Sequence, residues 1–169
     1  MESEKISDLE KKDYREILVQ DIYRQVSSKP ATVYKGANIS DAVKAIIEAK
    51  AQKCYVIDRK GILLGTITIE TLLRHAGYRV GAREPGVIPF FRFIREILKD
   101  RVDDIMAQPV PVKKEDKLVD ALKLMAEYHL NDLPVIDDSG RLIGELNALE
   151  VLILAKKWFH QKTETRGGE

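Results

Sequence analysis

The sequence contains little of what catalytic and metal-binding proteins commonly use. It has one cysteine, Cys54, which excludes an internal disulfide and a cysteine-rich metal site. Cys54 lies in an apolar run, so we expect a small buried residue there and not a reactive thiol. The three histidines have no HExxH spacing, and the chain has neither a nucleophile-elbow motif nor a glycine-rich phosphate loop. We therefore predict that the protein is not an enzyme and has no metal site.

The sequence also lacks an excess of charge of either sign and any long apolar run. Its 28 basic and 27 acidic residues give a net charge of +1, so no strong field favours nucleic acid or an anionic membrane. No apolar stretch reaches the roughly 20 residues of a membrane-spanning helix, and the N-terminal segment does not resemble a signal peptide. We predict a cytoplasmic protein without nucleic-acid binding or membrane insertion. Hydrophobic residues make up 44% of the chain, enough to form a core.

The chain carries one pattern twice, without a gap, at the offset that separates Pro30 from Pro109. Identical residues at this offset run from the first strand to the last helix of each copy. They are Val33/Val112, Lys35/Lys114, Asp41-Ala42/Asp120-Ala121, Glu48/Glu127, Val56-Ile57-Asp58/Val135-Ile136-Asp137, Gly61/Gly140, Leu63/Leu142, Gly65/Gly144 and Leu73/Leu152. Two copies of such length predict a pair of related subdomains, since solenoid arrays use shorter and more numerous repeats.

Each copy predicts the order β-α-β-β-α, and hence a mixed α+β or α/β fold. A short strand is followed by a helix whose apolar residues recur at i, i+3, i+4, i+7 and i+8. These residues are Ile39, Ala42, Val43, Ile46 and Ile47 in the first copy, and Leu118, Ala121, Leu122, Met125 and Ala126 in the second. Asn38 and Asp116 precede the helices as expected N-caps. Two apolar runs joined by an Asp/Gly turn then predict a hairpin, and a helix is expected to begin near Leu146.

Several segments of the second copy resemble a CBS domain, and the first copy matches more loosely. The segments are residues 102–106, 109–112, 133–137 and 140–144, with residues 19–22 as the counterpart of the first. The resemblance implies a Bateman module, in which two CBS units related by a pseudo-twofold axis pack through their small sheets. We accordingly divide the chain into an N-terminal helical lead-in (1–18), a first CBS domain (19–75), a linker with an amphipathic helix (76–101), a second CBS domain (102–157) and a C-terminal tail (158–169).

The resemblance also implies a function. Such pairs bind adenosine-containing ligands such as AMP, ATP or S-adenosylmethionine between the two domains, form dimers and regulate an enzyme or transporter. It therefore implies a stand-alone regulatory module that binds AMP, ADP or ATP as a regulatory ligand and requires no cofactor. The alternative is an interaction or scaffold protein that has lost the ligand and uses the CBS fold for dimerisation.

The family motif Gly-x-x-Thr/Ser-x-x-Asp distinguishes the two implied clefts, because its hydroxyl holds phosphate and its carboxylate holds ribose. The first copy keeps the hydroxyl but has Thr71 in place of the carboxylate, whereas the second copy has Glu150 there. In the family each cleft joins this motif of one copy to the first two strands of the other. The favoured cleft is thus expected to contain Ala31, Thr32, Lys53, Asn147 and Glu150, and the weaker cleft Val110, Pro111, Asn131, Thr68 and Thr71. The alternative is that Lys53 is a solvated strand-end residue and Glu150 a first-turn acid favoured by the helix dipole.

Two apolar segments lie outside these motifs. Residues 90–98 place aromatic and aliphatic side chains on a short helix, which we expect to pack on the module; the alternative is a docking surface for another protein. The helices around Leu72-Leu73 and around Val151-Leu152-Ile153-Leu154 are more apolar than one small sheet can cover. They predict a homodimer interface.

Overall fold

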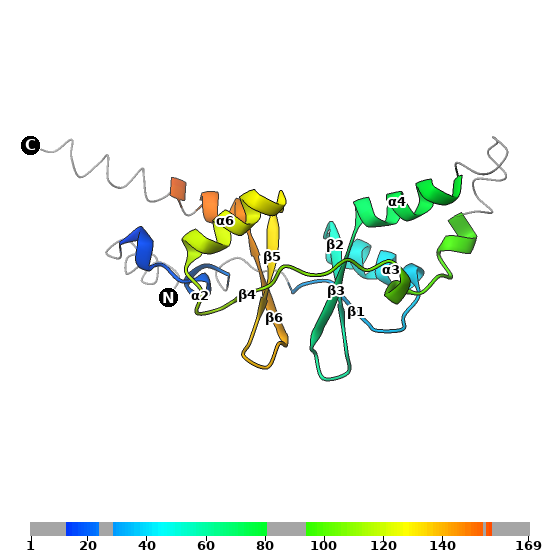
Figure 1. Ribbon diagram of the computed structural model, residues 1–169, viewed down its shortest axis with the longest axis horizontal. Coiled ribbons are helices and arrows are strands. Elements are labelled where there is room, and N and C mark those ends of the chain that lie inside the picture. Colours follow the sequence, from blue (N-terminus) through cyan, green and yellow to red (C-terminus); the bar gives the residue numbers. More distant parts are fainter. Residues whose placement is uncertain (1–12, 24–28, 81–93, 154, 157–169) are drawn as a thin grey trace, which may run out of the picture. The chain divides into compact units, whose positions relative to one another are not determined.

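The computed structural model describes residues 13–23, 29–80, 94–153 and 155–156. It contains two three-stranded sheets of the same strand order, β1-β2-β3 and β4-β5-β6 (Figure 1). The strands are β1 (Thr32–Tyr34), β2 (Lys53–Ile57), β3 (Leu63–Thr68), β4 (Val112–Lys113), β5 (Asp132–Ile136) and β6 (Leu142–Asn147). The first two strands of each sheet run parallel, and β2 and β3 form an antiparallel hairpin. The predicted mixed α+β fold with two repeated units is confirmed.

The helices fall at matching places in the two repeats. They are α3 (Ile39–Ala49) and α4 (Ile69–Val80) in the first repeat, and α6 (Leu118–Tyr128) and helical residues 148–153 in the second. Short helical turns precede each repeat: η1 (Tyr14–Glu16) and α2 (Val19–Ile22) before the first, and η2 (Val102–Asp104) before the second. The N-terminal part of the predicted lead-in helix and the C-terminal tail lie outside the described residues.

The described chain divides into two compact units that do not simply follow the order of the sequence. Unit 1 contains residues 13–23 with residues 110–138 and those from 143 onward, and unit 2 contains residues 29–80 and 94–109 with the turn 139–142. The segment before each repeat therefore belongs to the unit built on the other repeat. We call residues 17–23 the N-terminal arm and residues 98–106 the linker arm.

Backbone hydrogen bonds attach each arm to its unit. In unit 1, the Leu118 N–H donates to the Ile17 carbonyl at 2.8 Å, and the Val19 N–H donates to the Asp116 carbonyl at 2.9 Å. In unit 2, the Ile39 N–H donates to the Asp100 carbonyl at 2.9 Å. The Leu118 and Ile39 bonds use the first N–H groups of α6 and α3, which have no partner inside their own helices. Each arm thus completes the start of a helix in its unit.

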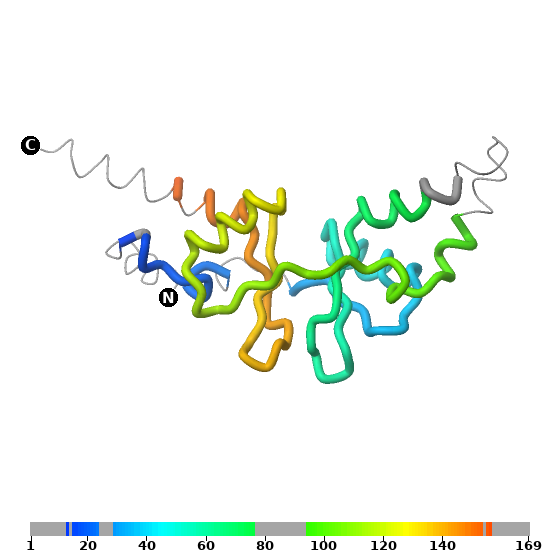
Figure 2. Tube along the Cα trace, viewed as in Figure 1, coloured from blue at the N-terminus to red at the C-terminus, as the bar shows by residue number. Residues whose placement is uncertain are grey.

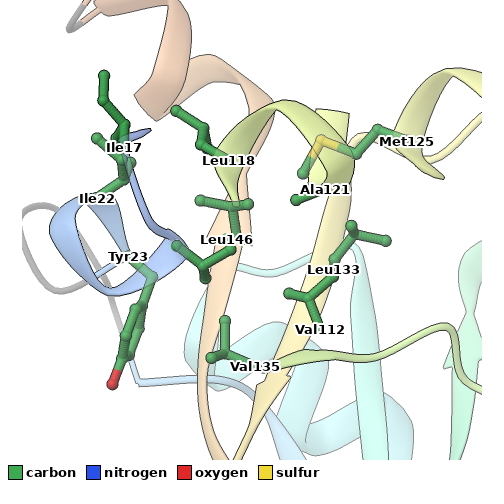
Figure 3. Packing of buried hydrophobic residues seen from close by; sticks show 11 residues of the cluster. Ile17, Ile22, Tyr23, Val112, Leu118, Ala121, Met125, Leu133, Val135 and Leu146 are labelled. Carbon is green, nitrogen blue, oxygen red and sulfur yellow. The ribbon is translucent and has the colours of Figure 1, made fainter. Parts of the chain in front are cut away.

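The arms also contribute to the cores. In unit 1, apolar side chains of the N-terminal arm, of α6 and of the strands point toward one another (Figure 3). Figure 2 shows how this arm lies beside elements that are far away in sequence. The buried members of the cluster are Ile17, Val19, Ile22, Tyr23, Val112, Leu118, Ala121, Met125, Leu133, Val135 and Leu146. Burial of apolar surface, at roughly 25 cal/mol per Å², is what holds the arm in place.

Each arm crosses a strand at a glycine. A Cβ atom on Gly144 of β6 would lie 2.5 Å from Cδ2 and 2.6 Å from Cε2 of Tyr23. A Cβ atom on Gly65 of β3 would lie 2.6 Å from Sδ of Met106. Carbon atoms in favourable contact are about 3.5–4.0 Å apart, so no side chain fits at either place. The repeated glycine of the motif therefore makes room for the arm of the same unit.

Unit 2 has two buried clusters. One joins β1–β3 to α3 and includes Cys54, which is fully buried as predicted. Burial raises the pKa of the Cys54 thiol to about 12. The other joins Ile39 of α3 to Ile97, with Ile94 and Leu98 packed against it. The predicted packing of the linker helix is thus confirmed for these residues, while Phe90, Phe91 and Phe93 lie outside the described part of the chain.

Three local predictions are wrong. The N-cap of α6 is Lys117, because the Asp116 carboxylate instead accepts the Lys113 N–H at 2.7 Å and forms the turn after β4. Ile47 of the first predicted apolar stripe is 69% exposed, and its equivalent Ala126 in the second stripe is exposed too, since α3 and α6 each bury a narrower face. Leu146 does not open a helix but lies in β6, where it is fully buried. Asn38, by contrast, is the N-cap of α3 as expected.

Candidate functional site

The predicted ligand residues of unit 2 lie together at one end of its sheet. Lys53 opens β2 and is paired in register with Thr68, the last residue of β3. Ala31 immediately precedes β1, and its carbonyl accepts the Tyr55 N–H at 2.8 Å. Thr32 pairs in register with Tyr55. Unit 2 thus places a lysine, two hydroxyls and the start of helix α4 at the same end of the sheet.

Tyr55 is a neighbour of this group that the sequence patterns did not identify. The Lys53 ammonium lies 5.7 Å from the centre of the Tyr55 ring, within the range of a cation–π contact. Lys53 and Tyr55 are two positions apart on β2 and so share one face of the strand, which is the signal that could have revealed the pair. Since the tyrosine is fully buried, the lysine stem is held against a fixed surface.

Thr68 and Thr71 are engaged with each other. Their hydroxyl oxygens are 2.9 Å apart, and the Thr68 hydroxyl also accepts the Thr71 N–H at 3.0 Å. This is the geometry of a residue that caps the first turn of a helix. Both hydroxyls of the first-copy motif are therefore committed to local structure at the start of α4.

The predicted ligand residues of unit 1 occupy the equivalent end of the second sheet. Asn147 is the last residue of β6, and its side-chain oxygen accepts the Leu149 N–H at 2.8 Å. The Ala148 N–H donates to the Asn131 carbonyl at 2.8 Å, which joins the loop before β5 to the end of β6. Val110 and Pro111 precede β4, the strand that runs parallel to β5. The arrangement repeats that of unit 2 with different side chains.

Glu150 is the most unusual group of this set. Its Oε2 atom is buried and has no hydrogen-bond partner among the residues that the structure describes. Loss of hydration raises the pKa of the Glu150 carboxyl, and the charge of Glu145 raises it further, whereas the Asn147 backbone N–H lowers it. The sequence predicted a first-turn acid here but not its burial or the influence of Glu145. A buried acceptor without a donor costs free energy, which a ligand hydroxyl can recover.

Both units expose apolar side chains on the helices that follow their hairpins. Leu73 of α4 is 67% exposed, and Leu149 and Leu152 are 64% and 65% exposed. Of the residues named for the predicted dimer interface, Leu73, Leu152 and Ile153 are exposed. Leu72 and Val151 are instead partly buried against the cores of their units, and Leu154 lies outside the described part of the chain. Among the described residues there is no group of side chains arranged for a metal ion, and no helix long and apolar enough to cross a membrane.

Comparison with known proteins gives a consistent assignment. The sequence matches the CBS domain family over residues 19–78 and 102–155. An uncharacterized protein of Methanocaldococcus jannaschii is 28% identical over 73% of this chain and 84% of its own length. A CBS domain-containing protein of Dictyostelium discoideum is 30% identical over 80% of this chain and 92% of its own length.

Solved structures agree with these relatives. A CBS domain-containing protein of Thermotoga maritima has a TM-score of 0.67 and 29% identity, over 84% of this chain and 96% of its own. CBSX2, crystallised in complex with AMP, has a TM-score of 0.63 and 26% identity, over 83% and 96% of the two chains. With two matched regions in tandem, two sheets of one topology and these structural relatives, the chain belongs to the CBS domain family.

Proposed function

We propose that the protein is a regulatory module, without catalytic activity, that binds one adenine nucleotide per chain and passes the resulting change to a partner protein. The nucleotide lies against Ala31, Thr32, Lys53, Asn147 and Glu150. The observation that carries the proposal is the buried, unpartnered Oε2 atom of Glu150. A ribose offers two adjacent hydroxyl donors, and a carboxylate with a free oxygen is a suitable acceptor for them.

Lys53 is the second group that supports the proposal. Its ammonium is a compact positive charge on a stem that lies against the Tyr55 ring, and it suits a phosphate group. The relative crystallised with AMP supports the adenosine class of ligand, which is consistent with both groups. AMP, ADP and ATP all satisfy this chemistry, because they share the ribose and differ in the length of the phosphate chain.

The cleft that contains Thr68 and Thr71 is proposed to bind the nucleotide more weakly for a physical reason. Thr71 stands where Glu150 stands in the other copy, and its hydroxyl is bonded to Thr68. Binding of ribose there would have to break that contact, and a neutral hydroxyl accepts hydrogen bonds less strongly than a carboxylate. The expected stoichiometry is therefore one strong site per chain.

Calorimetry with AMP, ADP and ATP tests the proposal on the wild type, Glu150→Ala and Thr71→Ala. Loss of a charge-assisted hydrogen-bonded pair costs about 1.5–3 kcal/mol, so Glu150→Ala is expected to weaken binding roughly tenfold to hundredfold. Glu115→Ala is the matched control, because it removes the same charge from an exposed turn. If Thr71→Ala abolishes binding while Glu150→Ala leaves it intact, the assignment of the cleft is wrong.

We further propose that two chains associate through the exposed apolar residues of the helices that follow the hairpins. Leu73 and Leu152 occupy equivalent positions in the two repeats, and both are about two-thirds exposed. Sedimentation equilibrium is expected to give about twice the chain mass of 19.2 kDa. Leu152→Glu should produce a monomer, whereas Ile143→Glu, at an exposed apolar residue of β6, should not. A wild-type monomer at high micromolar concentration would disprove this association.

If no adenine nucleotide binds and the dimer persists, the protein functions as a scaffold. The exposed helix faces are the observation that favours this second candidate. Thermal melting separates the two functions quickly, since a ligand at about 100 times its Kd stabilises the folded state by about 2.7 kcal/mol. For a chain of this size that corresponds to a shift of roughly 5–11 °C.

A further inference from the structure

A second concave feature of unit 2 lies away from the residues proposed to bind adenine nucleotide. It is an open cavity of about 660 Å³, and its walls include Tyr34, Lys35, Asp58 and Arg59. Its volume falls within the range of roughly 300–1,000 Å³ that is usual for small-molecule sites. Tyr34 and Lys35 come at the end of β1, and Asp58 and Arg59 follow the end of β2.

This cavity and the adenosine residues are at opposite ends of the same sheet. Lys53 opens β2, whereas Asp58 and Arg59 come directly after its last residue. At about 3.3 Å per residue, the five residues of β2 separate the two ends by roughly 13 Å. In Figure 1 the turn of the β2–β3 hairpin accordingly lies at the end of the sheet away from α4. A ligand here would not touch the groups assigned to ribose and phosphate.

The backbone on both sides of the cavity is fixed. The Lys35 N–H donates to the Ile57 carbonyl at 2.8 Å and extends the pairing of the two strands. Gly36 adopts a φ of +85° and donates its N–H to the Asp103 carboxylate at 2.8 Å. On the other side, one oxygen of Asp58 accepts the N–H groups of Lys60 at 2.8 Å and Ile62 at 2.9 Å. The backbone of the walls is therefore in place before any ligand binds, which reduces the entropic cost of binding.

The side chains offer a ring and two positive charges. Tyr34 is 61% exposed, an uncommon degree of exposure for a large aromatic residue in a folded domain. Lys35 and Arg59 form no ion pair with any other described residue. The Arg101 guanidinium lies beside Gly36 and adds positive charge nearby. Asp58 and Asp103 oppose this charge, but each has an oxygen that accepts backbone N–H groups.

The second repeat provides an internal comparison, because its equivalent positions carry a different set of charges. At the positions of Tyr34 and Arg59 it has Lys113 and Asp138, whose Nζ and Oδ1 atoms form an ion pair at 3.0 Å. Lys114, the equivalent of Lys35, pairs with Glu115 at 3.2 Å. Positions 34–36 and 58–59 of the first repeat carry two cations and one acid. The equivalent positions 113–115 and 137–138 of the second repeat carry two cations and three acids. A net positive charge at this edge is thus particular to the first repeat.

From this geometry we propose that the cavity at the ends of β1 and β2 is a second ligand site, which binds a small organic anion with a planar ring. The ring stacks on Tyr34, and the phosphate or carboxylate group lies between Lys35 and Arg59. Arginine can hold such a group through two parallel hydrogen bonds, and lysine adds a point charge. The site is independent of the adenine nucleotide proposed above.

Nuclear magnetic resonance of the full chain tests the proposal, with phenyl phosphate as the probe and inorganic phosphate as the ring-free comparison. For a probe of this size we expect a Kd on the order of 1 mM. The largest shift changes are expected at the amides of Tyr34, Lys35 and Arg59, and inorganic phosphate should bind at least about tenfold more weakly. Shift changes confined to Asn147 and Glu150 would place the probe at the adenosine site and overturn the proposal.

Three variants determine whether the side chains act as proposed. Arg59→Gln should weaken phenyl phosphate binding about tenfold, whereas Lys60→Gln, which removes the same charge from the same turn, should change it less than about twofold. The double variant Tyr34→Lys with Arg59→Asp copies the ion pair of the second repeat and should abolish binding without unfolding, as thermal melting would verify. Equal effects of Arg59→Gln and Lys60→Gln, or full binding by the double variant, would refute the site.

Discussion

Substitution of Gly144 by alanine tests how firmly the N-terminal arm is held in unit 1. The added Cβ atom would meet the Tyr23 ring at 2.5 and 2.6 Å, about 1 Å closer than a favourable carbon contact allows. Tyr23 is only 2% exposed and packs in a closed cluster, so its ring has little space to move. Overpacking of this kind costs about 1–3 kcal/mol.

A smaller effect opposes this cost, because alanine is favoured over glycine within a strand by roughly 0.5–1 kcal/mol. The net loss of stability for Gly144→Ala is therefore expected to be about 0–2.5 kcal/mol, with a middle value near 1 kcal/mol. Urea denaturation followed by circular dichroism would measure this loss, and thermal melting should show a decrease in Tm of roughly 2–4 °C for a loss of about 1 kcal/mol. The same substitution at Gly65 tests the linker arm, where the added atom meets Met106.

The decisive experiment combines Gly144→Ala with Tyr23→Leu. Tyr23→Leu alone removes buried surface and destabilises the protein, but it also makes room for the new methyl group. The two changes should therefore be less than additive, with a coupling of at least about 1 kcal/mol in a double-mutant cycle. An increase in Tm on Gly144→Ala, or strictly additive changes, would show that the ring does not lie over this glycine.

Three further predictions concern single residues. Lys50→Gly should stabilise the protein by roughly 0.5–1 kcal/mol in urea titrations, because Lys50 ends α3 at a φ of 51°, where only glycine is unstrained; a loss of stability would contradict this. The Cys54 thiol, fully buried with its pKa raised to about 12, should react with a disulfide reagent at pH 8 only after unfolding, so rapid modification of the folded protein would disagree. Adenosine affinity should fall as the pH decreases through the raised pKa of Glu150, since protonation removes the ribose acceptor, and Glu150→Gln should give a flatter profile. The folding stability of the free protein should depend on pH in the opposite direction. Because the pKa of Glu150 is raised by folding, its contribution to stability is complete below pH 4.5, the unfolded value, and is lost as the pH rises through the folded value.

The sequence repeat predicted the strands and helices of both units because its fixed offset carries one register onto the other. It could not predict which sheet each arm covers. The apolar residues around Val19 and Val102 indicate that both arms are buried. The sequence does not show against which sheet each arm packs, because both sheets have the same glycine at the equivalent position. The position of Asp116 does not distinguish an N-cap from a turn residue, because a carboxylate next to a helix can equally close the preceding turn.

The sequence likewise predicted only some features of the candidate site. Motif spacing located Thr71 and Glu150 at the starts of two equivalent helices. It did not indicate that the Thr71 hydroxyl is already bonded to Thr68, or that one oxygen of Glu150 is buried without a donor. Both facts depend on the packing of neighbouring turns, which residue type and spacing do not determine.

The exchange of arms between repeats has a consequence for how the chain is made. During synthesis, residues 17–23 leave the ribosome before the strands of unit 1 that cover them exist. The last of those strands ends at Asn147, 124 residues after Tyr23. At about 5–20 residues per second, the arm waits for roughly 6–25 s with Ile17, Val19, Ile22 and Tyr23 exposed. A newly made chain is thus open to chaperones, and to exchange of arms between neighbouring ribosomes, throughout that interval.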